Sequence, residues 1–218
     1  MILWFLTGNK GKLSEASALF SEYGIEVKQL EASIIEPQSD DLEEVARAKM
    51  AQALDYLPDK NDLLLVEDAG LFIDSLNGFP GVFSAYALQT IGSEGILRLM
   101  GHLQSEDPIQ DSHLRKGEFQ AVAVLHIAGE TLVGRGICPG RIAHKPSEGE
   151  GFGFDPIFIP SDLDALGEAL GPGELGEIST HGLPFGAIDS AQKHQFSHRA
   201  RALSSLMVMM NERRENLK

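Results

Sequence analysis

The chain has 218 residues, of which 43% are hydrophobic and 23% charged, fractions typical of folded globular proteins rather than of disordered ones. It carries 32 Asp and Glu against 18 Lys and Arg, and the net charge of −14 disfavours binding to a polyanion such as nucleic acid. The apolar runs are too short to span a bilayer, no secretory signal opens the chain, and the single cysteine, Cys138, cannot form an intramolecular disulfide. We therefore expect a cytoplasmic protein that binds neither membranes nor polymeric nucleic acid.

The first part of the chain alternates strand and helix patterns in the way that α/β proteins do. Ile2–Leu6 is a short apolar run that predicts a buried strand, and the polar turn Thr7–Lys12 leads from it into a helical pattern that ends at Gly24. Ile25–Leu30 predicts the next strand. Asp40–Leu57 contains neither Gly nor Pro and predicts a helix.

The remainder continues the alternation, with no internal repeat and no segment that resembles a linker between domains, so we expect a single domain over residues 1–218. The predicted strands and helices are a buried strand at Leu63–Val66 that ends at Glu67, a helix at Gly92–Leu103, a hairpin of Phe119–Ile127 and Thr131–Gly134, a short strand at Ile157–Ile159 and one long helix at Asp189–Arg214. The predicted irregular segments are a turn at Gly78–Gly81, a glycine-rich loop at Gly149–Gly153 and a surface excursion at Gly167–Gly186.

A glycine-containing turn before the first predicted helix is a candidate anion site. The turn reads Thr7, Gly8, Asn9, Lys10, Gly11, Lys12; its backbone N–H groups lie at a helix N-terminus, and Lys12 adds a positive charge. The spacing of its glycines is not that of a Walker A loop. A helix-capping turn with solvated lysines explains the same residues.

Acidic residues suggest a metal or a catalytic base at two places. Glu67 and Asp68 follow an apolar strand, where ligands of open α/β sheets often bind, and adjacent strand residues point to opposite faces, so one carboxylate of the pair would face a ligand. Glu44 lies in the first turn of a predicted helix, where the helix dipole favours acidic residues in any case. Solvated surface acids are the alternative for all three.

Two further segments could contact a nucleobase or a phosphate. Phe152, next to Gly153, could stack on a base, and Asp155, which follows Phe154, could accept hydrogen bonds from ring N–H groups. Lys193, His198 and Arg199 could donate to keto or phosphate oxygens, although a solvated basic helix face looks the same. The other histidines form no ligand pair at metal-binding spacing.

Taken in order, six segments of the chain resemble motifs of the inosine triphosphate pyrophosphatase (Ham1/RdgB-like) family. The segments are Thr7–Lys12, Glu44–Lys49, Glu67–Leu71, Leu76–Ala85, Gly151–Phe158 and Ser197–Leu203. The resemblance extends over nearly the whole chain. It implies an α/β fold with a long central mixed sheet flanked by helices, two lobes around a nucleotide-binding cleft, and a homodimer.

The resemblance also implies roles for individual residues. The loop Thr7–Lys12, with Lys10 and Gly11 in it, would bind the triphosphate, and Glu44 and Asp68 would hold Mg²⁺, Asp68 also accepting the proton of the attacking water. Phe152 would stack on the purine, Asp155, His198 and Arg199 would contact its 6-keto edge, and Lys193 would lie near the sugar and phosphates. The other substrate-binding residues implied are Ala69, Gly153 and Phe154. The chain departs from the family where Ala69 replaces Ser, where Phe154 replaces Tyr or Trp, and in its longer Gly- and Pro-containing stretch after Pro160.

The implied reaction is Mg²⁺-dependent hydrolysis of non-canonical purine nucleoside triphosphates (ITP, dITP, XTP) to the monophosphate and pyrophosphate. An inosine or xanthine 6-keto oxygen would accept from His198 or Arg199, whereas adenine presents a donor to these donors. Two alternatives stay open: a pyrophosphatase for other modified or standard nucleotides, in a Maf-like role, and a nucleotide-binding protein without turnover.

Overall fold

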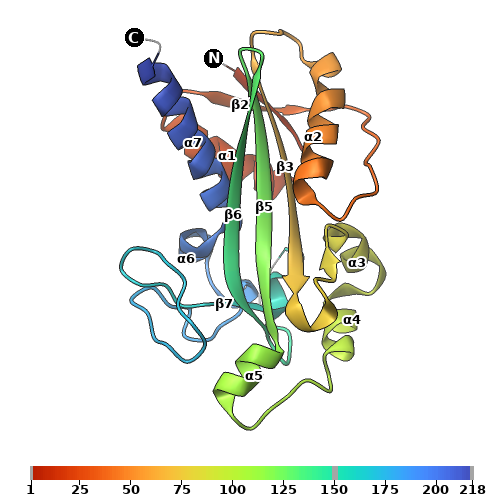
Figure 1. The fold of residues 1–218 in the computed structure, drawn as a ribbon, viewed down its shortest axis with the longest axis vertical. Helices are drawn as coiled ribbons and strands as arrows, with labels where there is room; N and C mark the ends of the chain where they lie inside the picture. Colours follow the sequence, from red (N-terminus) through yellow and green to blue (C-terminus); the bar gives the residue numbers. More distant parts are fainter. Residues whose placement is uncertain (1, 149–151, 217–218) are drawn as a thin grey trace. The chain divides into compact units, whose positions relative to one another are not determined.

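The computed structural model describes residues 2–148 and 152–216 of the chain and shows an α/β protein built on one mixed sheet (Figure 1). The seven strands are β1 (Ile2–Leu6), β2 (Glu26–Leu30), β3 (Leu63–Ile73), β4 (Pro80–Gly81), β5 (Lys116–Ile127), β6 (Glu130–Ile142) and β7 (Phe158–Pro160). The α-helices are α1 (Lys10–Ser21), α2 (Leu42–Ala53), α3 (Ser84–Thr90), α4 (Gly92–Leu99), α5 (Pro108–Leu114), α6 (Ser190–Phe196) and α7 (His198–Asn216). The predicted α/β class with a mixed sheet flanked by helices is confirmed. Among the described residues, no helix is long and apolar enough to cross a bilayer.

The sheet has the order β2-β1-β3-β5-β6-β7, with β4 paired to β3. Strand β1 is parallel to both β2 and β3, β4 is antiparallel to β3, and β7 is antiparallel to β6. The predicted hairpin joins β5 to β6 through Ala128 and Gly129, both at positive φ, as a two-residue hairpin turn requires.

The described chain forms two compact units. The first comprises Met1–Ala69, Ala121–Gly136 and Arg199–Lys218, and the second comprises Gly70–Gln120 and Ile137–His198. Each unit has its own apolar core, and β3, β5 and β6 contribute residues to both units. The two units are described separately below.

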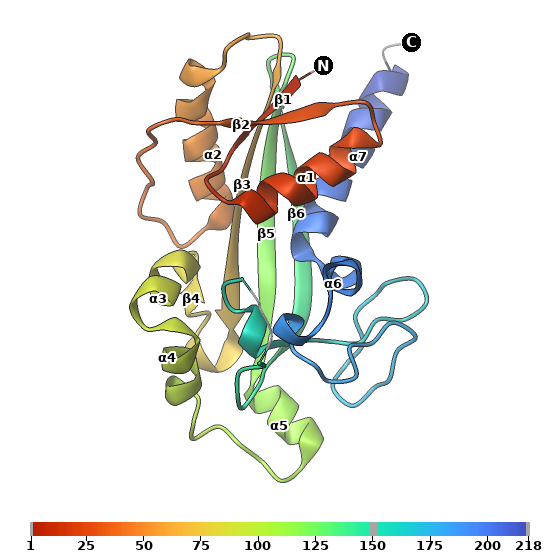
Figure 2. The ribbon, with the colours of Figure 1, turned by 180° about the vertical axis from the view of Figure 1, so that it is seen from behind.

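The first unit buries one face of its strands under α1 and α7, which lie side by side in both views (Figures 1 and 2). Alternate residues of the strands, such as Leu3, Phe5, Leu63 and Leu65, join its core together with Phe20 of α1. Because strand side chains alternate between faces, the residues between them point away from α1 and α7. Position 67 therefore faces these helices and position 68 faces away from them.

The core of the second unit gathers apolar side chains of β3, α4, β6 and β7 around Phe158 and Phe185. Arg115 is 2% exposed and donates to the carbonyl oxygens of Ile142, Met100, Leu103 and Ala143, so its guanidinium ties four backbone carbonyl groups of this unit together. The segment between β7 and α6 forms loops that extend from this unit, as predicted for residues 167–186, and include a short 3-10 helix at Phe185–Ala187 (Figure 2).

Several predicted boundaries are wrong. Strand β3 does not end at Glu67 but continues to Ile73, because its residues Leu71 and Phe72 pair with β4, and Gly70 has no Cβ to block the close approach of the Gly81 carbonyl. Strand β6 continues past Gly134 to Ile142, and α4 ends at Leu99, before the predicted Leu103. The predicted long C-terminal helix is two helices, α6 and α7, since Ser197 adopts an extended conformation between them. The first three residues of the predicted loop Gly149–Gly153 lie outside the described residues.

Candidate active site

The loop from β1 into α1 is held by its own side chains in the first unit. The Asn9 side chain caps α1 by accepting from the backbone N–H groups of Gly11 and Lys12, and the Thr7 hydroxyl accepts from the N–H of Asn9. Gly8 has no heavy atom within 4 Å of the position that a Cβ would take, so the backbone there is open to a ligand. Lys10 is exposed at the first position of α1. The capping and anion-binding interpretations of this turn are therefore compatible.

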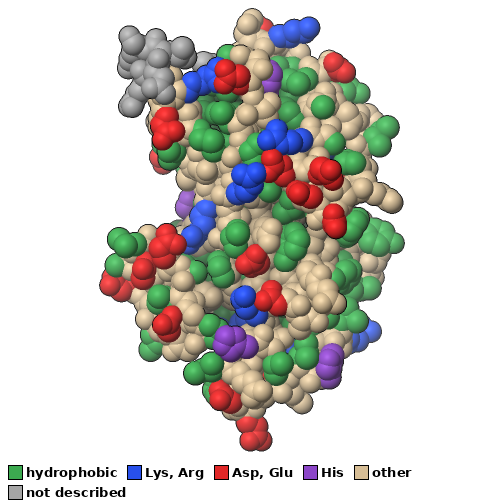
Figure 3. All heavy atoms as spheres, viewed as in Figure 1, with side chains coloured by type: hydrophobic (Ala, Val, Ile, Leu, Met, Phe, Trp, Pro, Cys, Tyr) green, Lys and Arg blue, Asp and Glu red, His purple; other side chains and the backbone are tan. Residues whose placement is uncertain are grey.

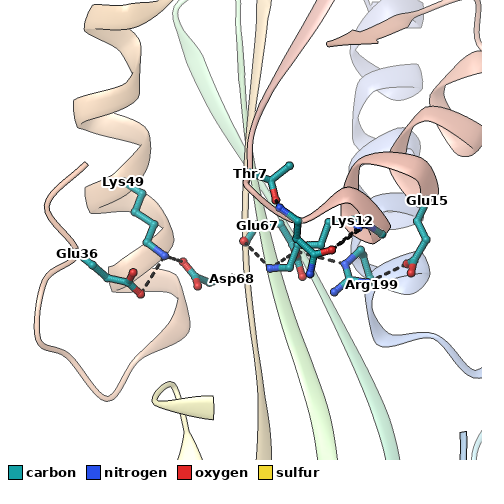
Figure 4. Close-up of polar contacts among 10 residues, drawn as sticks. Thr7, Lys12, Glu15, Glu36, Lys49, Glu67, Asp68 and Arg199 are labelled. Atoms are coloured by element: carbon teal, nitrogen blue, oxygen red, sulfur yellow. Dashed lines mark hydrogen bonds and ion pairs between the residues drawn. The ribbon is translucent and has the colours of Figure 1, made fainter. Parts of the chain in front are cut away.

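Lys12 and Arg199 converge on the buried carboxylate of Glu67. The Glu67 side chain is 0% exposed, and its Oε2 lies 2.7 Å from Lys12 Nζ and 3.3 Å from Arg199 Nε. Arg199 Nη1 also donates to Glu15 Oε2 of α1 at 2.9 Å (Figure 4). Burial opposes the charge of Arg199, but Glu67 and Glu15 outweigh it and raise the pKa of the guanidinium. These contacts fix the directions of two cations at the start of α1 and α7.

Asp68 points to the opposite side of β3 and meets α2. Lys49 Nζ lies 2.8 Å from Asp68 Oδ2 and 3.0 Å from Glu36 Oε1, so one ammonium group joins two carboxylates (Figure 4). Burial raises the pKa of Asp68, and the attraction of Lys49 works against that rise. Burial also disfavours the charge of Lys49, but its two carboxylate partners raise its pKa overall. The group therefore combines a carboxylate with raised basicity and a cation beside it.

Glu44 lies elsewhere on α2. It is exposed in the first turn, where its carboxylate accepts from the Ser39 hydroxyl and its backbone N–H donates to the N-cap Asp41. Glu36 and Lys49 are the residues that the structure brings to Asp68. Lys49 is the last residue of the Glu44–Lys49 motif, but the family resemblance implied no role for it. Nothing in the sequence around Glu36 distinguishes Glu36 from other surface acids. Ala69, the next residue of β3, packs partly buried against the core of the first unit.

The predicted base-binding residues lie in the second unit. Phe152 is 70% exposed, and its backbone N–H donates to Asp155 Oδ2 at 3.1 Å. Lys193 Nζ of α6 donates to the same oxygen at 2.6 Å, and Gly153 adopts φ +69° between the two phenylalanines. Phe154 is only 3% exposed and packs in the core of this unit. Asp155 thus joins the loop to α6, while the Phe152 ring stays available for stacking.

His198 is the first residue of α7 and is 7% exposed. Its ring stacks on Phe119 of β5, with 4.9 Å between centroids and 13° between planes. Its neighbour Arg199 belongs to the first unit and contacts Glu67 and Glu15, as described above. Adjacent residues thus have different surroundings, one aromatic and one acidic.

Within the described residues, no group of three or more His, Cys, Asp or Glu side chains is placed to hold a metal by itself. Mg²⁺, however, usually takes one or two protein carboxylates and completes its shell with water and substrate phosphates. Glu36 and Asp68, which already share the positive charge of Lys49, supply the hard oxygen donors that Mg²⁺ prefers. The donor set therefore fits a phosphate-bound Mg²⁺ ion. Cys138 is buried and contributes nothing to it.

Comparison with known proteins gives consistent results for sequence and fold. A model of the Ham1 family matches residues 3–209. A dITP/XTP pyrophosphatase of Methanopyrus kandleri is 43% identical over 82% of this chain and 89% of its own length, and one of Thermococcus kodakarensis is 38% identical over the full length of both. The solved structure of a Ham1 protein from Coxiella burnetii is 24% identical, has a TM-score of 0.74 and covers 97% of this chain and 99% of its own, and it therefore supports the fold.

Proposed function

This chain belongs to the Ham1 family, and we propose that it is a nucleoside triphosphate pyrophosphatase acting on non-canonical purine nucleotides such as dITP, XTP and ITP. The curated relatives, which are named dITP/XTP pyrophosphatases, support this substrate class. The observation that carries the proposal is the Glu36–Lys49–Asp68 group, in which a carboxylate with a raised pKa lies beside a cation on the opposite face of β3 from Lys12.

In the proposed reaction, a water molecule attacks the α-phosphorus, and the bond between this phosphorus and the oxygen that bridges to the β-phosphate breaks. Asp68 accepts the proton of the water; burial raises the pKa of this carboxyl, and Lys49 Nζ lies 2.8 Å from it. Pyrophosphate leaves, and the nucleoside monophosphate remains. We propose that the Thr7–Lys12 loop binds the phosphates through its backbone N–H groups and Lys12, whose direction is set by Glu67.

A bound Mg²⁺ ion would supply charge neutralisation at the phosphate oxygens. We propose Asp68 as one ligand. Glu44 is the second carboxylate implied by the sequence motif, but Glu36 is the better supported of the two because it shares Lys49 with Asp68.

We propose that the second unit recognises the base. Phe152 offers an exposed ring for stacking, and Asp155 is an acceptor for ring N–H groups. An N–H of His198 donates to the 6-keto oxygen of the purine. Adenine has a 6-amino group at this position, which is also a donor, so the His198 N–H and the amino group both stay unpaired. Arg199 remains a candidate for the same edge, although Glu67 and Glu15 bind its guanidinium here. We also propose a cytoplasmic homodimer without nucleic-acid or membrane partners.

The test is a substrate panel. The purified protein with Mg²⁺ is given XTP, dITP, ITP, ATP, GTP and dUTP at equal concentration, and the release of pyrophosphate and monophosphate is followed. The proposal predicts fast release from XTP, dITP or ITP and slow release from ATP and GTP. Preference for another nucleotide would overturn the base assignment, and no turnover of any would overturn the enzymatic one.

Substitution of the proposed base separates chemistry from binding. Asp68→Asn is expected to lower kcat by roughly 10²–10⁴-fold, because proton transfer to a positioned base is worth that much. Nucleotide affinity, measured by calorimetry, should persist. Asp59→Asn, an exposed acid in the turn before β3, is the matched control and should retain wild-type kcat. Near wild-type kcat in Asp68→Asn would contradict the role of Asp68.

A further inference from the structure

Four side chains of the second unit form a continuous series of ring and cation contacts. Lys193 Nζ lies 5.4 Å from the centroid of the Phe185 ring. Phe185 is stacked with Phe119 at 6.4 Å and 16°, and Phe119 is stacked with His198 at 4.9 Å and 13°. We call the pair Phe119 and Phe185 the aromatic support.

The two ends of this series are residues to which base and sugar recognition is assigned above. Lys193 is bound to Asp155, which also accepts from the backbone of Phe152, and His198 lies at the other end. Phe119 comes from β5, and Phe185 from the 3-10 helix before α6. The support therefore connects α6 and the start of α7 to the sheet of the same unit.

A histidine ring needs such a support in order to recognise a base. The torsion that rotates the imidazole about its Cβ–Cγ bond has broad minima, so packing, not the bond itself, decides the plane of the ring. The N–H bond lies in that plane, and a hydrogen bond weakens steeply as its angle departs from linearity. A nearly parallel phenyl face at 4.9 Å thus restricts the directions in which His198 can donate.

We propose that Phe119 is a positioning residue that determines base selectivity by holding the plane of the His198 ring, with Phe185 and Lys193 supporting it from behind. This inference rests on the proposed function, since it concerns the discrimination between 6-keto and 6-amino purines. Phe119 is half-buried, whereas Phe158, which contacts it at 4.5 Å, is 0% exposed. The two phenylalanines therefore allow a matched comparison.

The test compares three variants of the full chain. Phe119→Leu removes the ring stacked on His198, Phe119→Tyr restores a ring, and Phe158→Leu removes a different ring that contacts Phe119. The measured quantity is the ratio of kcat/KM for XTP to that for ATP. We expect the ratio to fall roughly three- to tenfold in Phe119→Leu, the range that one aromatic contact is worth. The fall should come mainly from a higher KM for XTP, and the ratio should be near wild type in Phe119→Tyr and Phe158→Leu.

A second readout does not depend on activity. The His198 ring protons lie against the face of Phe119, so the ring current shifts their NMR signals upfield. These signals, assigned by their loss in His198→Gln, should move downfield in Phe119→Leu and stay in place in Phe158→Leu. Thermal unfolding of each variant reports any general loss of stability, which is expected to be at least as large for Phe158→Leu.

The outcomes separate this inference from the proposed function. An unchanged substrate ratio in Phe119→Leu, together with loss of preference in His198→Gln, would overturn the inference and leave the proposed function intact. An equal fall of the ratio in Phe158→Leu would also overturn it, because general loosening would then explain the effect. Failure of the wild-type protein to prefer XTP over ATP would contradict the proposed function itself, and unmoved His198 signals would contradict the positioning role.

Discussion

Glu67 and Asp68 are adjacent in β3, yet their side chains have unlike environments. Glu67 is fully buried between Lys12 and Arg199, whereas Asp68 is 14% exposed and meets Lys49 on the other side of the strand. A buried carboxylate that pairs with two cations fixes the directions of both. Asp68, with its raised pKa, suits proton transfer better. The two-residue period of a strand thus separates the buried, ion-paired Glu67 from Asp68, the proposed base.

Lys49 influences the ionisation of Asp68 in a direction that can be measured. Its positive charge lowers a pKa that burial raises, so removing the charge in Lys49→Met should raise the pKa of Asp68 further. The proposed base works only when ionised, and a higher pKa requires a higher pH for the same ionised fraction. The acid limb of the profile of kcat against pH should therefore move to higher pH. Lys60→Met, at an exposed turn, should leave the limb unchanged, and a shift to lower pH would contradict the argument.

Substitution of Glu36 and substitution of Glu44 should have different effects on the Mg²⁺ concentration that the protein needs. Glu36 shares Lys49 with Asp68, and Glu44 binds Ser39 at the start of α2. Glu36→Gln should therefore raise the Mg²⁺ concentration for half-maximal rate by about tenfold or more, since a lost ligand typically costs that order in metal affinity. Glu44→Gln, a substitution of the same size, should change it little. The reverse order would assign the second ligand to Glu44.

At the scale of elements, close approaches of the backbone decide where strands and helices can lie. Gly134 of β6 faces α7, and a Cβ at this position would come within 2.1 Å of the carbonyl oxygen of Ala202 and 2.9 Å of Leu206 Cγ. The chain leaves helical geometry at Ser197, between α6 and α7. This break places His198 and Arg199 at the first two positions of α7. The close approach at Gly134 follows from packing of β6 against α7.

Gly134→Ala should accordingly destabilise the protein by about 1–3 kcal/mol, the usual cost of overpacking, because a backbone oxygen cannot move aside as a flexible side chain can. Denaturant unfolding followed by circular dichroism measures the change. Gly101→Ala is the control, since its nearest contact would be an ordinary 3.4 Å from the carbonyl oxygen of Arg98. Equal stability of the two variants would refute the close-packing argument.

At the scale of the whole molecule, charge governs which partners can bind. The net charge is −14, and on the face drawn in Figure 3 the basic side chains are interspersed with acidic ones. The basic residues of the candidate site are paired: Lys12 and Arg199 with Glu67, Lys49 with Asp68, and Lys193 with Asp155. Such pairing holds the cations in fixed positions and cancels much of their charge, and the net negative charge of the chain repels long polyanions.

We therefore expect no binding of a labelled 30-base-pair duplex at physiological salt up to about 10 µM protein, because each phosphate neutralised needs an accessible cation. Fluorescence anisotropy measures this, with XTP binding to the same preparation as the positive control. Micromolar affinity with a steep salt dependence would reveal a basic surface and would overturn the expectation.

Much of the architecture follows from local patterns in the chain. The apolar runs predicted β1 and the first part of β3, the absence of Gly and Pro predicted α2, and the strand patterns at Phe119–Ile127 and Thr131–Gly134 predicted the hairpin. The six motifs and their order can be read directly from the sequence, and they identified the family. These features depend on neighbours along the chain or on residue type.

The contacts of the candidate site depend instead on residues far apart in the chain. The sequence places Glu36 in an unremarkable loop and Phe119 in an ordinary strand, and only the fold brings them to Asp68 and His198. It also decides that β3 continues past Glu67, because Leu71 and Phe72 pair with β4. Hydrophobic period and turn chemistry are local and can be read from the chain. Ion pairs, ring stacking and backbone approaches require coordinates, because each joins groups whose separation is set by tertiary packing.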